Sequence, residues 1–419
     1  MSSCYYDPMF YLCSEEMPFT IRIELHIKET VDGAALSAAV NEAIRRYPYF
    51  SVEVIERDGE WVTIPNPRPI AVYPGPDVLP LGGEEVGRHL LALMFEENRI
   101  HFCVSHVITD GAGFMPMLKS TLYYYFCRRE NRMLDPAGIR LADSPFLPDE
   151  LGNPYPEDAM RDAQSLTPPV REFFRLTDGG YVTDDIRTVF RVRVPEEDIL
   201  RFGHGHDASP CALVSSLMAQ AVWQVHSQET RDLVSAVSFN LRPGLGNRAG
   251  YRMLCNALPL RYPARLRNAP IDRVCTCTRG MVTLQSQPEN VLAYAQRKRE
   301  EMTRLLAVPG AKQKQAVLAP AALADAVNNT FSVSYVGKPD MGCLTPYLDA
   351  AYNLTDGSTY RTAFIEIASM NGYFDLAFIQ GFSNDVYYRV FLHQLALNGL
   401  CYTEEGAEPL ATPGMILPE

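Results

Sequence analysis

The hydrophobic period of this chain changes from two residues to about 3.6 near its beginning, and changes again near its middle. Residues 19–29, FTIRIELHIKE, alternate apolar and polar side chains as a half-buried strand does. The residues that follow place their apolar side chains on one helical face until Pro48 ends the pattern. The second change follows the alternating stretch RTVFRVRV (187–194), where Ser209 and Pro210 have the residue types of an N-cap and a first helical turn. Repeated strand-to-helix changes predict an α/β or α+β fold.

Pairs of residues that favour tight turns interrupt three apolar runs and predict three hairpins. These pairs are Asp58-Gly59, Glu97-Asn98 and Asn371-Gly372. Hairpins pair strands antiparallel, whereas strand–helix–strand connections favour parallel pairing, so we expect mixed sheets. Residues 131–180 are rich in proline and show little periodicity, which predicts a linker and a domain boundary. The expected domains are an N-terminal half over residues 1–165 and a C-terminal half over residues 180–419.

The charge and the cysteines narrow the functional classes. A formal net charge of −12 and a pI near 5.3 argue against a nucleic-acid partner and against docking on an anionic membrane. The ten cysteines form no C-x-x-C pair, which is typical of reduced thiols rather than of a disulfide framework or a zinc site. The first residues lack the pattern of a signal peptide, and no apolar run approaches the ~20 residues of a membrane span. We therefore expect a cytoplasmic protein without a membrane span.

The stretch SHVITDG (105–111) is the strongest candidate for chemistry. His106 stands where an alternating apolar stretch gives way to a turn, and histidine can take up and return a proton near neutrality. Asp110 can hold the turn through hydrogen bonds, and Gly111 and Gly113 let the backbone approach a ligand or another segment closely. The same residues also suit an ordinary strand-to-helix turn, in which Asp-Gly is a favoured pair.

The order of predicted elements around this motif resembles that of the CoA-dependent acyltransferases and the nonribosomal-peptide condensation domains. Their signature is HHxxxDG, which reads SHxxxDG over residues 105–111 here. VSFNLRP (237–243) is similar to the strand and arginine of their second half, and FSVSYVGKPDMG (331–342) is similar to the segment after their central crossover. The similarity in element order covers nearly the whole chain, with one good motif and two weak ones.

The resemblance implies two chloramphenicol-acetyltransferase-like domains that form a V-shaped pseudo-dimer with a tunnel between them. In that family the second histidine of the motif faces the tunnel, and this position is His106. The aspartate, Asp110 here, is chiefly structural and pairs with an arginine of the other half, for which Arg242 is the candidate. Gly111 would keep space beside the tunnel. The chain departs from the family at Ser105, where strand alternation predicts an effect on packing rather than on proton transfer.

The activity that the resemblance implies is acyl transfer from acyl-CoA to a hydroxyl or amine of a small molecule. His106 would be the general base, and no cofactor would be bound permanently. A first alternative is the condensation of thioesters held on the phosphopantetheine of a carrier protein, which would be a separate chain because no carrier domain is recognisable here. A second alternative is a non-catalytic binding protein that retains the fold, which the serine at position 105 brings into consideration.

Two further groups of residues need an interpretation. Ser332 and Ser334 could donate hydrogen bonds to an oxyanion or line the tunnel, although serines in buried strands more often bond to backbone groups. His204 and His206 have a spacing seen in metal sites, but no cysteine or acidic cluster with ligand spacing accompanies them. We therefore predict a loop before a helix at these histidines, and no metal site.

Overall fold

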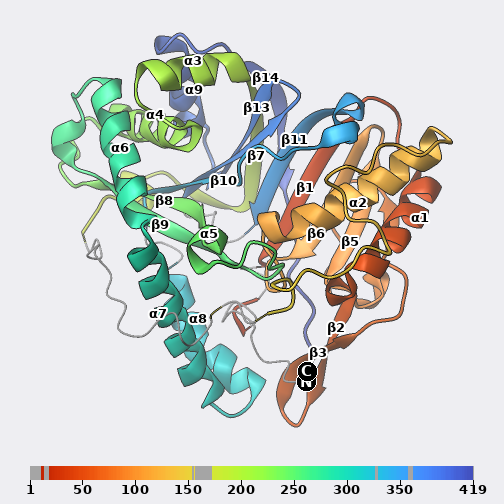
Figure 1. The fold of residues 1–419 in the computed structure, drawn as a ribbon. Coiled ribbons are helices and arrows are strands. Elements are labelled where there is room, and N and C mark those ends of the chain that lie inside the picture. Colours follow the sequence, from red (N-terminus) through yellow and green to blue (C-terminus); the bar gives the residue numbers. More distant parts are fainter. Residues whose placement is uncertain are drawn as a thin grey trace.

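Two main sheets of mixed strand direction organise the protein, with helices packed against them (Figure 1). The computed structural model describes residues 11–13, 18–152, 155, 172–325, 329–356 and 362–418. The predicted fold class, α/β with mixed sheets, is confirmed.

The first sheet has five strands, and the helices α1 (Gly33–Ala43) and α2 (Gly111–Arg129) pack on one of its faces. In sheet order the strands are β11 (Leu348–Asp356), β1 (Thr20–Ile27), β6 (Arg99–Ser105), β5 (Leu91–Glu96) and β4 (Val72–Pro74). The face of β1 that points to the helices carries four apolar side chains. These are Ile21, Ile23, Leu25 and Ile27, all of which are buried.

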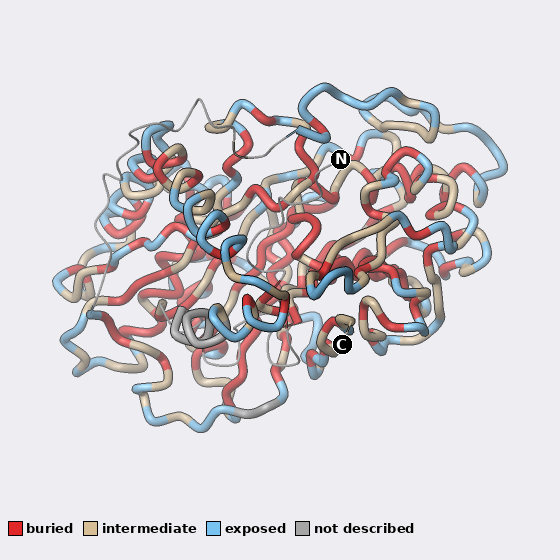
Figure 2. The backbone as a smooth tube through the Cα atoms, turned by 90° about the horizontal axis from the view of Figure 1, so that it is seen from below, coloured by how far each residue is buried: buried red, intermediate tan, exposed pale blue. Residues whose placement is uncertain are grey.

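The second sheet has seven strands. In sheet order they are β14 (Thr403–Leu410), β7 (Thr183–Pro195), β13 (Tyr373–Phe382), β12 (Ala363–Met370), β10 (Phe331–Tyr335), β8 (Leu233–Asn240) and β9 (Cys255–Tyr262). The core of this half lies between the sheet and three helices, which are α4 (Pro210–Val225), α6 (Ile271–Gln285) and α9 (Val386–Leu397). Two shorter helices, α3 (Glu196–Gly205) and α5 (Arg242–Leu245), also belong to this half. In Figure 2 the buried residues gather in the interior of the molecule, and the exposed ones lie mostly at its periphery.

The strand β11 joins the two sheets. It comes late in the chain, yet it pairs antiparallel with β1, so that Thr355 lies opposite Ile21 and Asn353 opposite Ile23 (Figure 1). Its backbone also contacts the second sheet, because the N–H of Ala351 donates to the carboxylate of Asp375 in β13 at 2.9 Å. One strand therefore belongs to the first sheet by pairing and to the later half by sequence.

Two further segments bring late residues to the first half. The turn between α7 (Pro288–Leu306) and α8 (Ala311–Asp325) contacts the hairpin of β2 (Val52–Arg57) and β3 (Glu60–Pro65). There the N–H of Ala311 donates to the Gly59 carbonyl at 2.7 Å. The last described residues also contact this hairpin, because the Trp61 indole N–H donates to the Pro418 carbonyl at 3.1 Å. The first half is thus completed by three segments from beyond residue 280.

The three predicted hairpins are confirmed as β2–β3, β5–β6 and β12–β13. The sequence pattern does not predict β9, β11 or β14, the last of which follows α9. β14 is an edge strand whose side chains are mostly exposed. A strand without a buried face has no reason to alternate apolar and polar residues, so the pattern is missing there.

The expected loop at His204 and His206 is also wrong. His204 lies in the last turn of α3, and His206 is its C-cap. The Nδ1 of His206 is 2.9 Å from the Phe202 carbonyl, and its ring stacks on that of Phe202 with the centroids 3.9 Å apart. Acidic residues in the first turn of α3 stabilise the helix at its N-terminus, so it persists through two glycines.

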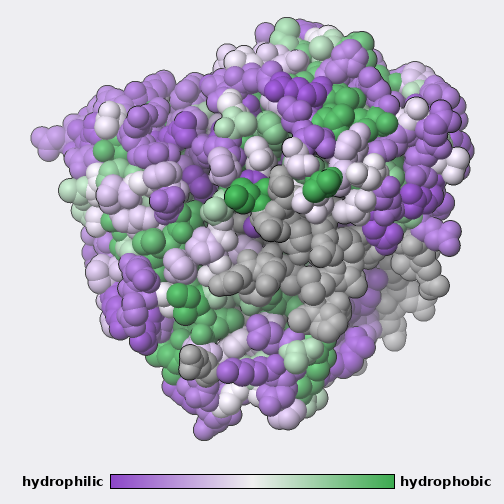
Figure 3. All heavy atoms as spheres, turned by 180° about the vertical axis from the view of Figure 1, so that it is seen from behind, coloured by the Kyte–Doolittle hydropathy of each residue, from purple (hydrophilic) through white to green (hydrophobic). Residues whose placement is uncertain are grey.

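The face shown in Figure 3 is mostly hydrophilic, with smaller groups of hydrophobic residues between. In the described part of the chain, none of the helices combines the length and the apolarity that a membrane crossing needs.

Candidate functional site

His106 lies in the turn between β6 and α2, one residue beyond the end of the strand. Its backbone N–H donates to the Phe19 carbonyl at 2.6 Å, and its ring Nδ1 is 2.9 Å from the Thr109 carbonyl oxygen. A carbonyl oxygen can only accept, so this contact assigns the proton of the neutral ring to Nδ1. The Nε2 atom then keeps its lone pair, which is the form that a general base requires.

Asp110 is the N-cap of α2. Its Oδ1 accepts a hydrogen bond from the backbone N–H of Gly113 at 2.8 Å, which satisfies one of the free donors at the helix start. Its Oδ2 accepts a second backbone hydrogen bond from Leu254, also at 2.8 Å, just before β9. Asp110 therefore ties the turn that holds His106 to the C-terminal half of the chain.

Arg242 completes this connection. Its Nη1 lies 2.9 Å from Oδ2 of Asp110, and its Nη2 lies 2.8 Å from Oδ1. The same guanidinium donates to the carbonyls of Gly250 at 2.9 Å and Arg252 at 2.8 Å. The two side chains are only 5% and 4% exposed, and a charge pair this deeply buried is tolerated when its remaining donors and acceptors are satisfied. The structure thus brings Asp110 and Arg242 together, as the resemblance implies.

Glycine is required at position 113 by a close approach of the two halves. A Cβ there would lie 2.2 Å from the Tyr251 carbonyl oxygen and 2.8 Å from Nη2 of Arg242. The Thr109 hydroxyl fastens the same place by donating to the Tyr251 carbonyl at 2.6 Å. Gly111 has more room, since its Cβ would meet Val336 at an ordinary 3.4 Å. The sequence does not predict the roles of Thr109 and Tyr251, because the two residues in contact are 142 positions apart in the chain.

Ser105 is fully buried and serves the turn. Its N–H donates to the Leu90 carbonyl at 2.9 Å, and its Oγ accepts from the N–H of Val107 at 3.4 Å. In β6 it shares a side of the sheet with His101 and Cys103, whereas Phe102 and Val104 point to the helices. By this alternation, the side chain of Ser105 points to the face opposite the one to which Val104 points, and His106 continues the side of Val104.

Ser332 and Ser334 lie on β10 with half-buried side chains. The Ser332 hydroxyl donates to Oδ1 of Asn329 at 3.4 Å, and Ser334 lies opposite Glu366 of β12 in the parallel pairing. Neither serine forms a hydrogen bond with His106 in the structure. Val336 follows Ser334 by two residues, and its side chain would be the nearest neighbour of a Cβ atom at Gly111.

Glu366 is a site residue that sequence patterns do not reveal. Its Oε1 accepts a hydrogen bond from the Thr355 hydroxyl of β11 at 2.6 Å. Burial raises the pKa of this carboxyl to about 7, although hydrogen bonds from Thr355 and Ser334 act in the opposite direction. Its only signal in the sequence is a charged residue within an otherwise apolar strand, AFIEIASM.

A small apolar pocket lies between α2, β1, β11, β12 and residues 336–341. Its volume is about 30 Å³, room for two or three water-sized groups, since each needs roughly 10–15 Å³. Its lining includes Ile23, Leu25, Met115, Leu118, Val336, Asn353, Ala368 and Met370. The pocket is therefore built by both halves of the chain, one helical turn beyond the start of α2.

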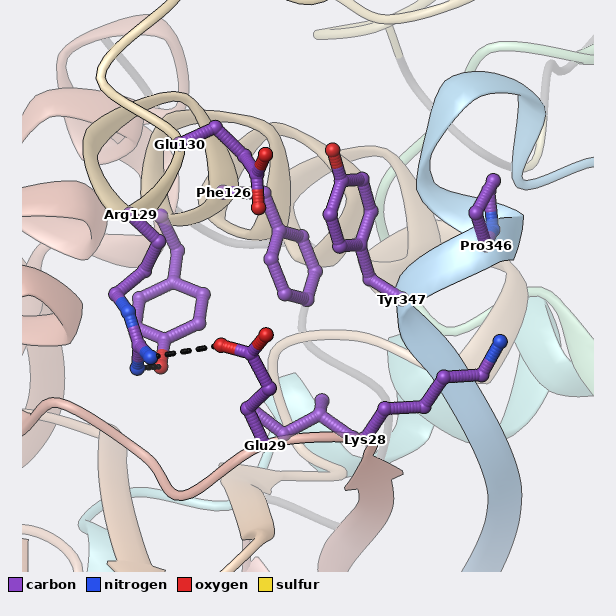
Figure 4. Close-up of a pocket in the computed structure, with 9 residues that line it drawn as sticks. Lys28, Glu29, Phe126, Arg129, Glu130, Pro346 and Tyr347 are labelled. Carbon is purple, nitrogen blue, oxygen red and sulfur yellow. Dashed lines mark hydrogen bonds and ion pairs between the residues drawn. The ribbon is translucent and has the colours of Figure 1, made fainter.

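A larger pocket, of about 230 Å³, lies at the other end of α2 (Figure 4). Phe126 and Tyr347 stack on its wall with their ring centroids 4.4 Å apart, and Arg129 pairs with Glu29 at 2.9 Å. The 19-residue helix α2 is about 28 Å long, so this pocket is remote from the SHxxxDG residues.

Buried charges join the sheets on the face opposite the helices. Nε and Nη2 of Arg191 in β7 bind Oε1 and Oε2 of Glu24 in β1, at 3.0 Å and 2.7 Å. Burial works to raise the pKa of Glu24, but hydrogen bonds from His26 and Arg191 and nearby positive charge outweigh it and lower the pKa. Burial and the neighbouring Arg22 lower the pKa of His101 to about 3, so His101 is neutral at physiological pH. No set of three or more His, Cys, Asp or Glu residues suited to a metal ion occurs within the described residues.

Comparisons with known proteins agree with this geometry at the level of the fold. No family model matches the sequence, and a search of curated proteins finds no match. Among solved structures, polyketide synthase associated protein 5 from Mycobacterium tuberculosis is similar with a TM-score of 0.61 and 13% identity, over 97% of this chain and 99% of that chain. TRI101 of F. graminearum, in complex with Coenzyme A and deoxynivalenol, has a TM-score of 0.61 and 11% identity, over 97% and 100%.

The first condensation domain of the CDA synthetase is similar in the same way, with a TM-score of 0.57 and 15% identity over 95% of this chain and 96% of that chain. These likenesses extend over nearly the whole chain. The chain therefore has the two-domain, chloramphenicol-acetyltransferase-like fold that the CoA-dependent acyltransferases share with the condensation domains.

Proposed function

We propose that the protein is an acyltransferase that moves an acyl group from acyl-CoA to a hydroxyl or amine of a small molecule. The observation that carries the proposal is the contact of His106 Nδ1 with the Thr109 carbonyl, which assigns the ring proton to Nδ1 and leaves Nε2 as the base. This histidine stands at the junction that Asp110 and Arg242 fix between the two halves. The fold supports the same conclusion, since TRI101 binds Coenzyme A on it.

In the proposed reaction, Nε2 of His106 takes the proton of the acceptor hydroxyl or amine as this group attacks the thioester carbonyl. The tetrahedral intermediate collapses with loss of the thiolate of CoA, which receives the proton back from the His106 imidazolium. An acceptor and an acyl-CoA thus give an acylated acceptor and free CoA. No covalent acyl-enzyme is needed because the thioester is already activated. Hydroxyl groups such as those of Ser332 and Ser334, or backbone N–H groups, would stabilise the oxyanion.

The small apolar pocket supports short acyl donors. Its wall is made of methionine, leucine, isoleucine and alanine side chains, and its volume of about 30 Å³ leaves room for only a few carbon atoms. Acetyl-CoA is therefore the first donor to test. The reduced thiols of the described cysteines fit a reaction in the cytoplasm.

The test is thiol release from acetyl-CoA in the presence of a panel of small alcohols and amines. His106→Ala should lower the rate by ~10²–10⁴-fold, the usual contribution of general acid–base catalysis. His204→Ala is the matched control, because this histidine is exposed at the end of α3. Equal turnover by wild type and a folded His106→Ala protein would remove His106 from the mechanism.

The fold is shared with condensation domains, so the same panel should be run with an acetylated phosphopantetheinyl carrier protein as the donor. If turnover occurs with the carrier-bound donor but not with acetyl-CoA, the acyl donor of the reaction is a carrier protein and not acyl-CoA. Binding of CoA without turnover over the whole panel would identify a binding protein that retains the fold.

A further inference from the structure

Glu366 differs from the other buried carboxylates of the protein. Arginine side chains bind Glu24, Asp110, Glu150 and Asp375. Glu366 is only 3% exposed, yet its carboxylate accepts a hydrogen bond from the hydroxyl of Thr355, and Ser334 lies opposite it in the pairing of β10 with β12. Among the described residues no arginine, lysine or histidine forms an ion pair with it. A buried ionised carboxylate without a counter-ion is costly, so such a group holds a proton or meets a cation from outside the chain.

Glu366 borders the apolar pocket described above. In β12, Glu366 lies two residues before Ala368. In β11, Thr355 lies two residues after Asn353. In the segment that begins with β10, Ser334 lies two residues before Val336. Ala368, Asn353 and Val336 all line that pocket. Because residues two apart in a strand point to the same side, the three polar side chains continue the three walls of the pocket.

The same polar group lies toward His106. Thr355 is opposite Ile21 of β1, and Ile21 is opposite Val104 of β6. Two strand spacings, roughly 10 Å, separate Thr355 from Val104, and His106 follows Val104 by two residues. Val104 and Ile21 both point to the helix-covered face. Glu366 and His106 therefore border one region, from the second sheet and from the first.

The chemistry of the donor decides which substrate would supply the cation. The pantetheine arm near the thioester of acyl-CoA is uncharged, and the remainder of CoA carries phosphates, which a carboxylate repels. Resting on the proposed function, we propose that Glu366, with Thr355, binds an ammonium group of the acceptor that lies a few bonds from its nucleophilic atom. The preferred acceptors are then amino alcohols and diamines rather than neutral alcohols. Glu366 is in this role a positioning residue for the acceptor.

The experiment compares matched acceptors that differ only in the cation. 5-Amino-1-pentanol and 1-hexanol have the same heavy-atom length, and so do 3-amino-1-propanol and 1-butanol. With acetyl-CoA, the wild type should show a kcat/KM about tenfold or more higher for the amino alcohol of a pair, because a buried charged site rejects an analogue that leaves it unpaired. Glu366→Gln should abolish most of this preference, mainly through KM, and Glu366→Asp should restore part of it. Glu85→Gln, an exposed glutamate of the first half, is the control that keeps the preference.

A preference that is unchanged in Glu366→Gln would overturn the inference. A direct binding measurement separates this failure from failure of the proposed function. Calorimetric titration of wild type with 5-amino-1-pentanol should give a binding heat that 1-hexanol lacks and that Glu366→Gln loses, whether or not acyl transfer occurs. If no acceptor is acylated but this binding is present, acyl transfer fails and the cation site stands. If neutral and amino alcohols are acylated at equal rates without selective binding, acyl transfer stands and the cation site fails.

Discussion

Arg242 holds both carboxylate oxygens of Asp110 although 132 residues separate the two in the chain. Asp110 ends the turn that begins at His106, and it also accepts hydrogen bonds from the backbone N–H groups of Gly113 and Leu254. One carboxylate thus caps a helix, binds a buried arginine and joins the two halves. This concentration of roles predicts that its loss affects stability before chemistry.

Removing one partner of this pair should destabilise the protein by ~3–5 kcal/mol, because the remaining charge is left buried without compensation. We expect Asp110→Asn and Arg242→Ala each to lower the free energy of unfolding by about this amount in urea denaturation. The double variant should lose clearly less than the sum of the two losses. Strict additivity would show that the two side chains do not act as a pair, and a stable but inactive Asp110→Asn protein would give Asp110 a direct catalytic role.

Gly113→Ala tests the close approach of the two halves. The added Cβ would meet the Tyr251 carbonyl and the Arg242 guanidinium, and neither can move without breaking hydrogen bonds. Overpacking of this kind costs ~1–3 kcal/mol, and the melting temperature should fall accordingly. Gly280→Ala in α6 is the matched control, since nothing lies within 4 Å of its Cβ position. That variant should gain ~0.5–1 kcal/mol from helix propensity. Equal melting temperatures for the two variants would contradict the crowding at Gly113.

The acyl preference should change when the apolar pocket is widened. Met115→Ala removes side-chain volume from the wall next to the start of α2. The ratio of rates with hexanoyl-CoA and acetyl-CoA should rise about tenfold, in line with the ~1–3 kcal/mol that one methylene group is worth in an apolar pocket. Val317→Ala, which changes an exposed side chain of α8, should leave the ratio as it is in the wild type. An unchanged ratio in Met115→Ala would place the acyl chain elsewhere.

Glu366 predicts a specific pH dependence of stability. Burial raises its pKa from 4.5 to about 7 in the folded protein. The folded protein therefore holds this proton up to about pH 7, whereas the unfolded chain releases it above pH 4.5. The stability that the bound proton contributes is complete below pH 4.5 and is lost as the pH rises through 7. The glutamine of Glu366→Gln cannot ionise. The free energy of unfolding of the variant minus that of the wild type should therefore increase by up to about 3 kcal/mol between pH 4 and pH 8.

The measurement is urea denaturation of both proteins at several pH values. Asp375, whose pKa burial raises to about 6, contributes equally to both proteins and cancels in the difference. A difference that stays constant over this range would mean that Glu366 is ionised and compensated throughout.

Features whose causes lie within a few neighbouring residues follow from the sequence alone. Ser209 and Pro210 begin α4 as predicted, because an N-cap hydroxyl and a first-turn proline act on their own turn of helix. The hairpin at Asn371-Gly372 forms for the same reason, since both residues adopt positive φ there. The SHxxxDG residues indicate a strand, a turn and a helix, and the N-cap at Asp110 follows from its own side chain.

The meeting of distant segments, in contrast, depends on the tertiary fold. β11 pairs with β1 through backbone hydrogen bonds that every residue can form, so its sequence does not specify its partner. β14 lies at an edge, where exposed side chains leave no periodic pattern. The burial of Glu366 beside Thr355 depends on two sheets that meet along β11, and no local pattern encodes it. Local propensity and periodicity depend on interactions within one segment. The site, in contrast, forms where segments from both halves of the chain pack together and exclude water.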